Sequence, residues 1–207
     1  MEFLPRDLSE RYQFILRADA DVSFAPDLVA LLLAEFEQDP KLGIAGPLLL
    51  EPSRTGWREL REPRFHAPGP LKMYSVACFT AIGGLKPGLG WDTIDDVCAL
   101  MRGFRTSHFP DIRGFHHRPQ GAASGACRNR VAQGYAAYFA GYSPLFMLAR
   151  AAVNSLSYPP LCGGALMFLA YSRGCVQRWP RAISPELIGF VRRQQLRRLF
   201  LMETLWR

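Results

Sequence analysis

The sequence predicts an α/β domain with a mostly parallel sheet, followed by a helical C-terminal tail. Three observations support this fold class. The first 50 residues read as strand, acidic turn, helix and strand, which is the order of a βαβ unit. Hydrophobic residues make up 49% of the 207 residues, which is enough for a core and too many for a disordered chain. After residue 119 the apolar residues follow a helical pattern to the end.

The opening unit begins with residues 12–17, a short apolar run of β-forming residues that ends before an acidic pair. Pro26 suits the first turn of a helix, and apolar residues recur at helical spacing as far as Phe36. Residues 42–50 form a second apolar run with the length of a buried strand. We expect these two strands to be parallel, with the helix as their crossover.

Glycine and proline divide the rest of the chain. Residues 51–70 are rich in proline, glycine and charge, and they predict a long surface loop. We expect a catalytic-domain part at 1–143 and a helical, basic tail at 144–207. The further expected elements of the domain part are helices over 76–82 and 92–102, each stopped by glycine, and short strands over 106–109 and 112–116 around Pro110.

Positive charge is concentrated in the tail. The net charge is +7, yet residues 1–171 carry 17 Lys and Arg against 16 Asp and Glu, whereas residues 172–207 carry 8 Arg against 2 Glu. Such asymmetry indicates either an anionic partner surface or a basic helix that is simply solvated. Aromatic residues of the tail do not alternate with arginine as base-stacking platforms do, so we expect a membrane surface as the partner and no nucleic acid.

An uncharged stretch of 20 residues, 152–171, precedes this basic segment. Polar residues and two prolines interrupt it, and its cleanest apolar part, 161–171, has 11 residues, which is too short to cross a bilayer. The stretch predicts an interfacial or re-entrant segment, or a buried helix hairpin. The five cysteines lack any C-x-x-C spacing, which argues against a disulfide scaffold or a zinc finger and indicates a reducing compartment.

The first candidate site is Asp19-Ala20-Asp21, directly after the first predicted strand. Carboxylates at positions i and i+2 of a turn can share one face, and open α/β sheets bind ligands beyond the carboxyl ends of their strands. Two such groups suit Mg²⁺ or Mn²⁺ and leave coordination positions for water and a diphosphate. The alternative is a common acidic turn or a helix cap.

The second candidate is the segment Gly90-Trp91-Asp92-Thr93-Ile94-Asp95-Asp96. Asp92, Asp95 and Asp96 stand at i, i+3 and i+4, so we expect them to crowd one face of a first helical turn. Clustered carboxylates beside a glycine-rich turn suit a general base. The alternative is that acids in a first turn complement the helix dipole.

The third candidate is Phe115-His116-His117-Arg118-Pro119. In a strand the two histidines point to opposite faces, so at most one would face a site, as a metal ligand or a phosphate contact. Arg118 can pair with phosphate. A structural role for each histidine is the alternative.

Together these segments resemble the family 2 glycosyltransferases with a GT-A fold. The matching residues are ADAD at 18–21, PDL at 26–28, KLGIAGP at 41–47, CFTAIGGL at 78–85, GWDTIDD at 90–96, HHRPQG at 116–121 and GYSPLFML at 141–148. The resemblance covers residues 12–148 and implies a partial GT-A fold with a Rossmann-like sheet. It further implies a bacterial enzyme of polysaccharide biosynthesis, cytoplasmic and peripheral at the inner membrane.

The resemblance also implies a role for each matched residue. Asp19 and Asp21 would hold a divalent metal, Mg²⁺ or Mn²⁺, and with Arg118 the diphosphate of a UDP-, GDP- or dTDP-sugar. His117, or else His116, would complete the metal site. The catalytic base would be Asp96, assisted by Asp95, and the acceptor side would be lined by Gly83, Gly84, Trp91 and Asp92.

Members of this family carry a further N-terminal half, which grips the nucleotide base, before the Asp-x-Asp strand. We therefore expect this chain to lack that half, and an upstream segment or a partner protein to supply it. Tyr74-Ser75-Val76 also lacks the basic residue that often follows the aromatic one in the family.

Two functions are compatible with this pattern. One is inverting, metal-dependent transfer of a sugar to a glycan or a lipid-linked saccharide, and the other is a non-catalytic remnant or scaffold subunit of a glycan-assembly complex.

Overall fold

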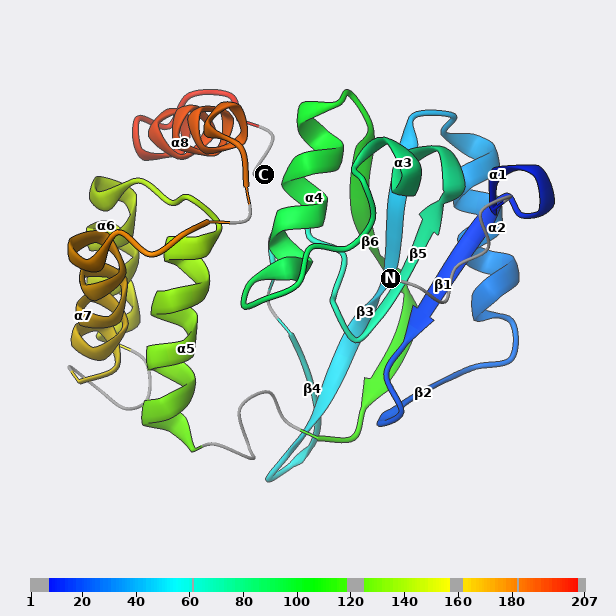
Figure 1. The fold of residues 1–207 in the computed structure, drawn as a ribbon. Helices are drawn as coiled ribbons and strands as arrows, with labels where there is room; N and C mark the ends of the chain where they lie inside the picture. Colours follow the sequence, from blue (N-terminus) through cyan, green and yellow to red (C-terminus); the bar gives the residue numbers. More distant parts are fainter. Residues whose placement is uncertain (1–7, 61, 119–124, 157–161, 182, 205–207) are drawn as a thin grey trace. The chain divides into compact units, whose positions relative to one another are not determined.

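The computed structural model describes residues 8–60, 62–118, 125–156, 162–181 and 183–204 (Figure 1). The chain packs as two compact units that interleave in the sequence. The first comprises Met1–Leu85 and Cys98–Arg118, and the second comprises Lys86–Val97 and Pro119–Arg207. The expected division after residue 143 stays a prediction.

The first unit is built on a mixed sheet. The strand order is β1-β5-β3-β6-β2, with β4 paired to β3 outside this path. Only β3 and β6 pair in parallel among the described strands, so the α/β class is confirmed but the prediction of a mostly parallel sheet is wrong. The strands are β1 (Phe14–Ala18), β2 (Val22–Phe24), β3 (Leu42–Ser53), β4 (Gly56–Glu59), β5 (Leu71–Ser75) and β6 (Arg105–His116).

The predicted strand–helix–strand opening is present, but its two strands are not neighbours. β1 and β3 run in the same direction, and β5 lies between them, antiparallel to both. The helix that connects them is α2 (Leu28–Gln38), which follows Pro26 as the sequence predicts. Its Leu28, Leu32 and Phe36, one helical turn apart, are buried in the core cluster with apolar residues of β3 and β5.

Residues 51–70 do not form the predicted surface loop. The first three complete β3, and a hairpin leads into β4. Residues 65–69 are buried, and the carbonyl of Phe65 accepts a hydrogen bond of 2.6 Å from Thr106 Oγ1. Nδ1 of His108 lies 3.1 Å from the carbonyl oxygen of His66, and burial lowers the pKa of His108. Contacts with β6 thus hold residues 65–69 in the interior, although the composition of this segment predicts a surface loop.

The two short strands predicted around Pro110 form one strand, β6. Its register against β3 shifts between the pairs Pro47–Phe109 and Leu48–Arg113. Residues 110–112 therefore form a bulge, where the missing N–H of proline removes no ladder hydrogen bond. Beyond the bulge, β6 continues to His116, so this candidate site residue is the last residue of the strand.

The predicted helices at 76–82 and 92–102 are confirmed as α3 (Val76–Ala81) and α4 (Trp91–Met101), and a short α1 (Leu8–Arg11) precedes the sheet. The hydroxyl of Ser75 caps α3 by accepting a hydrogen bond from the Cys78 N–H at 3.2 Å. Gly83 and Gly84 end α3 with φ values of 73° and 68°. Their N–H groups donate to the carbonyls of Thr80 and Phe79, which is a Schellman motif.

From Ala126 on, the elements that the structure describes in the second unit are all helices, as predicted. Its α5 and α7 approach closely because Gly134 lies against the Met167 carbonyl and Gly174 lies against the Tyr138 ring. α6 packs on α7 as well, which agrees with the helix-hairpin interpretation of 152–171, although residues 157–161 lie outside the described part. In the described residues no helix is long and apolar enough to span a membrane. The helices are α5 (Ala126–Phe139), α6 (Pro144–Asn154), α7 (Cys162–Gln177) and α8 (Pro185–Leu199).

Candidate donor and metal site

The Asp-x-Asp segment forms the turn between β1 and β2. Its backbone is fixed by hydrogen bonds from the Asp19 N–H to the Pro70 carbonyl, 2.9 Å, and from the Val22 N–H to the Asp19 carbonyl, 3.4 Å. The carboxylate of Asp19 accepts a charged hydrogen bond of 2.7 Å from Arg17, whose guanidinium also donates to the Gly69 carbonyl. Asp19 therefore has a structural partner within the turn.

The ladder between β2 and β6 brings the histidine segment to this turn. Val22 pairs with His116, and the His117 N–H donates to the Asp21 carbonyl at 2.9 Å. As a result Nε2 of His116 lies 3.5 Å from Oδ1 of Asp21. Nε of Arg118 lies 4.0 Å from Oδ2 of the same carboxylate. The structure thus brings Asp21, His116 and Arg118 together, from segments almost 100 residues apart.

Glu51 is a further site residue, and sequence reasoning did not identify it. It lies near the end of β3, is only 2% exposed, and places Oε1 3.4 Å from Nδ1 of His116. Its Oε2 lies 3.7 Å from the guanidinium of Arg58 across the β3–β4 hairpin. The signal in the sequence is slight: a single carboxylate directly continues the apolar run 42–50. Glu51 and Asp21 thus face the two nitrogens of one imidazole ring.

His117 has a different environment. Its Nε2 lies 2.7 Å from Ser23 Oγ, and its ring packs edge-on against Trp57 with 5.5 Å between centroids. The side chains of His116 and His117 have different neighbours, as expected for consecutive residues that point to opposite faces of a strand. The geometry therefore favours His116 over His117 as the histidine of the Asp21 site, the reverse of the preference drawn from the resemblance.

The acidic cluster of α4 is distributed differently from the prediction. Only Asp92 lies in the first helical turn, and the buried pair Asp95 and Asp96 follows in the next. The Asp96 N–H donates to the Asp95 carboxylate at 2.8 Å. These acids and Trp91 belong to the second unit, whereas Gly83 and Gly84 belong to the first. The predicted catalytic and acceptor roles of these six residues stay predictions.

The side chains of Asp21 and His116 are chemically compatible with a divalent metal. Among the described residues no group of three His, Cys, Asp or Glu side chains could hold a metal ion. A metal that is bound largely through substrate phosphates needs only one or two protein carboxylates. Asp21 and His116 offer an oxygen and a nitrogen 3.5 Å apart, and an imidazole beside a carboxylate favours a transition metal such as Mn²⁺ over Mg²⁺. On this criterion the residues fit the ion.

The likeness of this chain to known proteins lies in its structure. No family model and no curated protein matches it. Among solved structures it resembles the mannosyltransferase PcManGT from Pyrobaculum calidifontis in complex with GDP-Man and Mn²⁺, with a TM-score of 0.47 and 15% sequence identity. The match covers 92% of this chain and 57% of the length of that structure.

Proposed function

We propose that this chain is part of an inverting, metal-dependent glycosyltransferase that uses a nucleotide-sugar donor. The observation that carries the proposal is the convergence of Asp21, His116 and Arg118 at the turn between β1 and β2. A carboxylate, an imidazole nitrogen and a guanidinium together suit a metal diphosphate, because the first two bind the cation and the third pairs with phosphate oxygens.

In this proposal Asp21 and His116 hold the cation, and Arg118 orients the diphosphate of a UDP-, GDP- or dTDP-sugar. When bound, the metal would neutralise the negative charge that develops on the departing diphosphate. Asp96 accepts the proton of the acceptor hydroxyl, with Asp95 hydrogen-bonded to its backbone. The hydroxyl attacks the anomeric carbon opposite the leaving group, which inverts the configuration. The acceptor is a glycan or a lipid-linked saccharide at the inner face of a bacterial membrane, and Gly83, Gly84, Trp91 and Asp92 line its side.

A binding experiment separates the donor residues from the base. We expect UDP or GDP to bind this chain, or the chain extended upstream, only in the presence of Mn²⁺. Asp21→Asn and His116→Gln should each weaken this binding at least tenfold, because each removes one cation ligand. Asp96→Asn should bind the nucleotide normally and lose sugar transfer. Asp111→Asn, an exposed acid in the β6 bulge, is the matched control and should behave as wild type.

A second function, as a scaffold subunit that retains the motif only as structure, is favoured by one observation. The Asp19 carboxylate is occupied by Arg17 at 2.7 Å, so half of the Asp-x-Asp pair already stabilises the turn. Under this alternative neither the chain nor its extended form binds nucleotide with Mn²⁺, and Asp19→Asn lowers the thermal stability. The same titration therefore distinguishes the two functions.

A further inference from the structure

The C-terminal end of α8 presents apolar side chains to solvent. Phe200 is 70% exposed, Leu201 92% and Met202 54%. The opposite face of the helix packs inward through Leu187, Val191 and Gln195, so α8 is anchored within its unit. Gln195 also accepts a hydrogen bond of 2.7 Å from the Ser143 N–H. Three consecutive exposed apolar residues at the end of an anchored helix indicate contact with an apolar partner.

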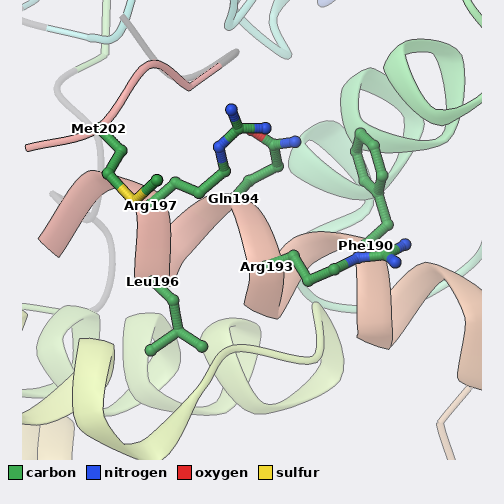
Figure 2. Close-up of a pocket in the computed structure, with 6 residues that line it drawn as sticks. All are labelled: Phe190, Arg193, Gln194, Leu196, Arg197 and Met202. Atoms are coloured by element: carbon green, nitrogen blue, oxygen red, sulfur yellow. The ribbon is translucent and has the colours of Figure 1, made fainter. Parts of the chain in front are cut away.

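A groove lies beside these residues. Its volume is about 520 Å³. Figure 2 shows that α8 contributes five of the six labelled side chains and that Met202 comes from the segment that follows. The lining residues are Phe190, Arg193, Gln194, Leu196, Arg197 and Met202. Apolar and cationic side chains therefore share the same surface.

Two arginines line the groove, and each has a further arginine next to it in the sequence. Arg192, Arg193, Arg197 and Arg198 all stand in the second half of α8, and one of them, Arg192, donates to the Gly141 carbonyl at 3.3 Å. Arg193 and Arg197 are exposed at the groove itself. The acidic residues of the sequence 172–207 are Glu186, in the first turn of α8, and Glu203, directly after Met202. The partner of this surface is thus expected to be anionic as well as apolar.

The backbone conformation at Leu201 indicates that its side chain contacts another molecule rather than the rest of the chain. α8 ends in a Schellman motif, since the N–H groups of Leu201 and Met202 donate to the carbonyls of Arg198 and Arg197 at 3.2 and 2.8 Å. The position of Leu201 in this motif usually holds glycine, and its φ of 56° is unfavourable for leucine. Because the side chain is almost fully exposed, packing does not compensate for this strain.

We propose that the end of α8 binds a membrane surface that contains anionic phospholipids. Arg193 and Arg197 lie on the headgroups, while Phe200, Leu201 and Met202 enter the boundary with the acyl chains. Exposed aliphatic residues favour a lipid over a nucleic acid, which would be bound by the cations and by stacking aromatic rings. This inference does not rest on the proposed transferase activity. It assigns a role to the arginines that make the tail positively charged.

The test is co-sedimentation of the full chain with vesicles. We expect binding to vesicles of phosphatidylglycerol and phosphatidylcholine, and little binding to phosphatidylcholine alone. The double variant Arg193→Gln/Arg197→Gln should bind about 25-fold more weakly, since each basic residue near an anionic surface contributes about a fivefold factor. Arg102→Gln/Arg128→Gln, which removes the same charge from exposed residues of the turn after α4 and of α5, should bind as wild type.

Leu201→Gly separates binding from folding. Glycine relieves the unfavourable φ, so the thermal stability should stay the same or rise. Binding to the anionic vesicles should nevertheless fall about tenfold, because the inserted side chain is lost. Leu201→Met should retain it.

Three results would overturn the proposal. The first is equal binding to neutral and anionic vesicles, and the second is equal loss in the two double arginine variants. The third is unchanged vesicle binding by Leu201→Gly together with tight binding of single-stranded DNA, which would identify a nucleic acid as the partner instead.

Discussion

The buried carboxylate of Glu51 fixes one side of the His116 imidazole. Oε1 of Glu51 lies 3.4 Å from Nδ1, so the tautomer with its proton on Nδ1 would donate to Glu51 and leave Nε2, on the side of Asp21, available to a cation. Histidines that bind metals commonly donate their second nitrogen to a carboxylate in this way. Glu51 is therefore a positioning residue for the proposed cation site.

Substitution of Glu51 tests this role. Glu51→Gln keeps an acceptor oxygen for His116 but removes the charge, so the affinity for Mn²⁺ in the presence of GDP should fall about 10- to 100-fold. Electron paramagnetic resonance of free Mn²⁺ measures this, and circular dichroism checks that the fold is kept. Glu59→Gln, on the exposed neighbouring strand β4, is the matched control. Normal Mn²⁺ affinity of Glu51→Gln would show that Glu51 has a purely structural role.

The site residues differ in how far the sequence reveals them. Asp21 and the histidine pair stand in recognisable segments, so their types and order suffice to propose a metal diphosphate site. The sequence cannot decide between His116 and His117, because that depends on the register of β2 against β6. Glu51 escapes notice because it follows an apolar run and precedes a stretch whose composition predicts a loop.

At the scale of elements, local patterns predict the helices better than the sheet. α2, α3 and α4 follow from apolar spacing, proline and glycine, which act over a few residues. The strand β5, LKMYS, is short and has a charged residue, Lys72, that is fully buried between its neighbours. Its insertion between β1 and β3 is decided by long-range pairing. The expectation of parallel neighbours fails for this reason.

The contact between α5 and α7 gives a prediction about stability. A Cβ at Gly134 would overlap the Met167 carbonyl and approach the Ala170 Cβ to 2.8 Å. Because backbone atoms cannot yield without moving a helix, Gly134→Ala should lower the free energy of unfolding by about 1–3 kcal/mol. Gly189→Ala in α8, where a Cβ meets nothing within 4 Å, should raise it by about 0.5–1 kcal/mol. Chemical denaturation measures both, and equal effects of the two variants would contradict this account of the α5–α7 contact.

At the scale of the whole molecule, the two units are joined through more than one crossing of the chain. Residues 86–97 belong to the second unit, while both flanking segments belong to the first. Helix α4 begins in the second unit and ends in the first. The boundary between the units falls inside the helix, between Val97 and Cys98. If the second unit unfolded alone, α4 would keep only residues 98–101, which is shorter than any helix that is stable without support.

We therefore expect the two units to unfold together, in one transition. Gly134→Ala alters only the second unit, yet it should lower the midpoint of the whole transition rather than split it. Hydrogen exchange followed by mass spectrometry provides the measurement, because peptides from β3 and from α7 report on different units. In the variant both sets of amides should lose protection by the same factor. Loss of protection in α7 with β3 unchanged would mean that α4 does not couple the units and that each can open by itself.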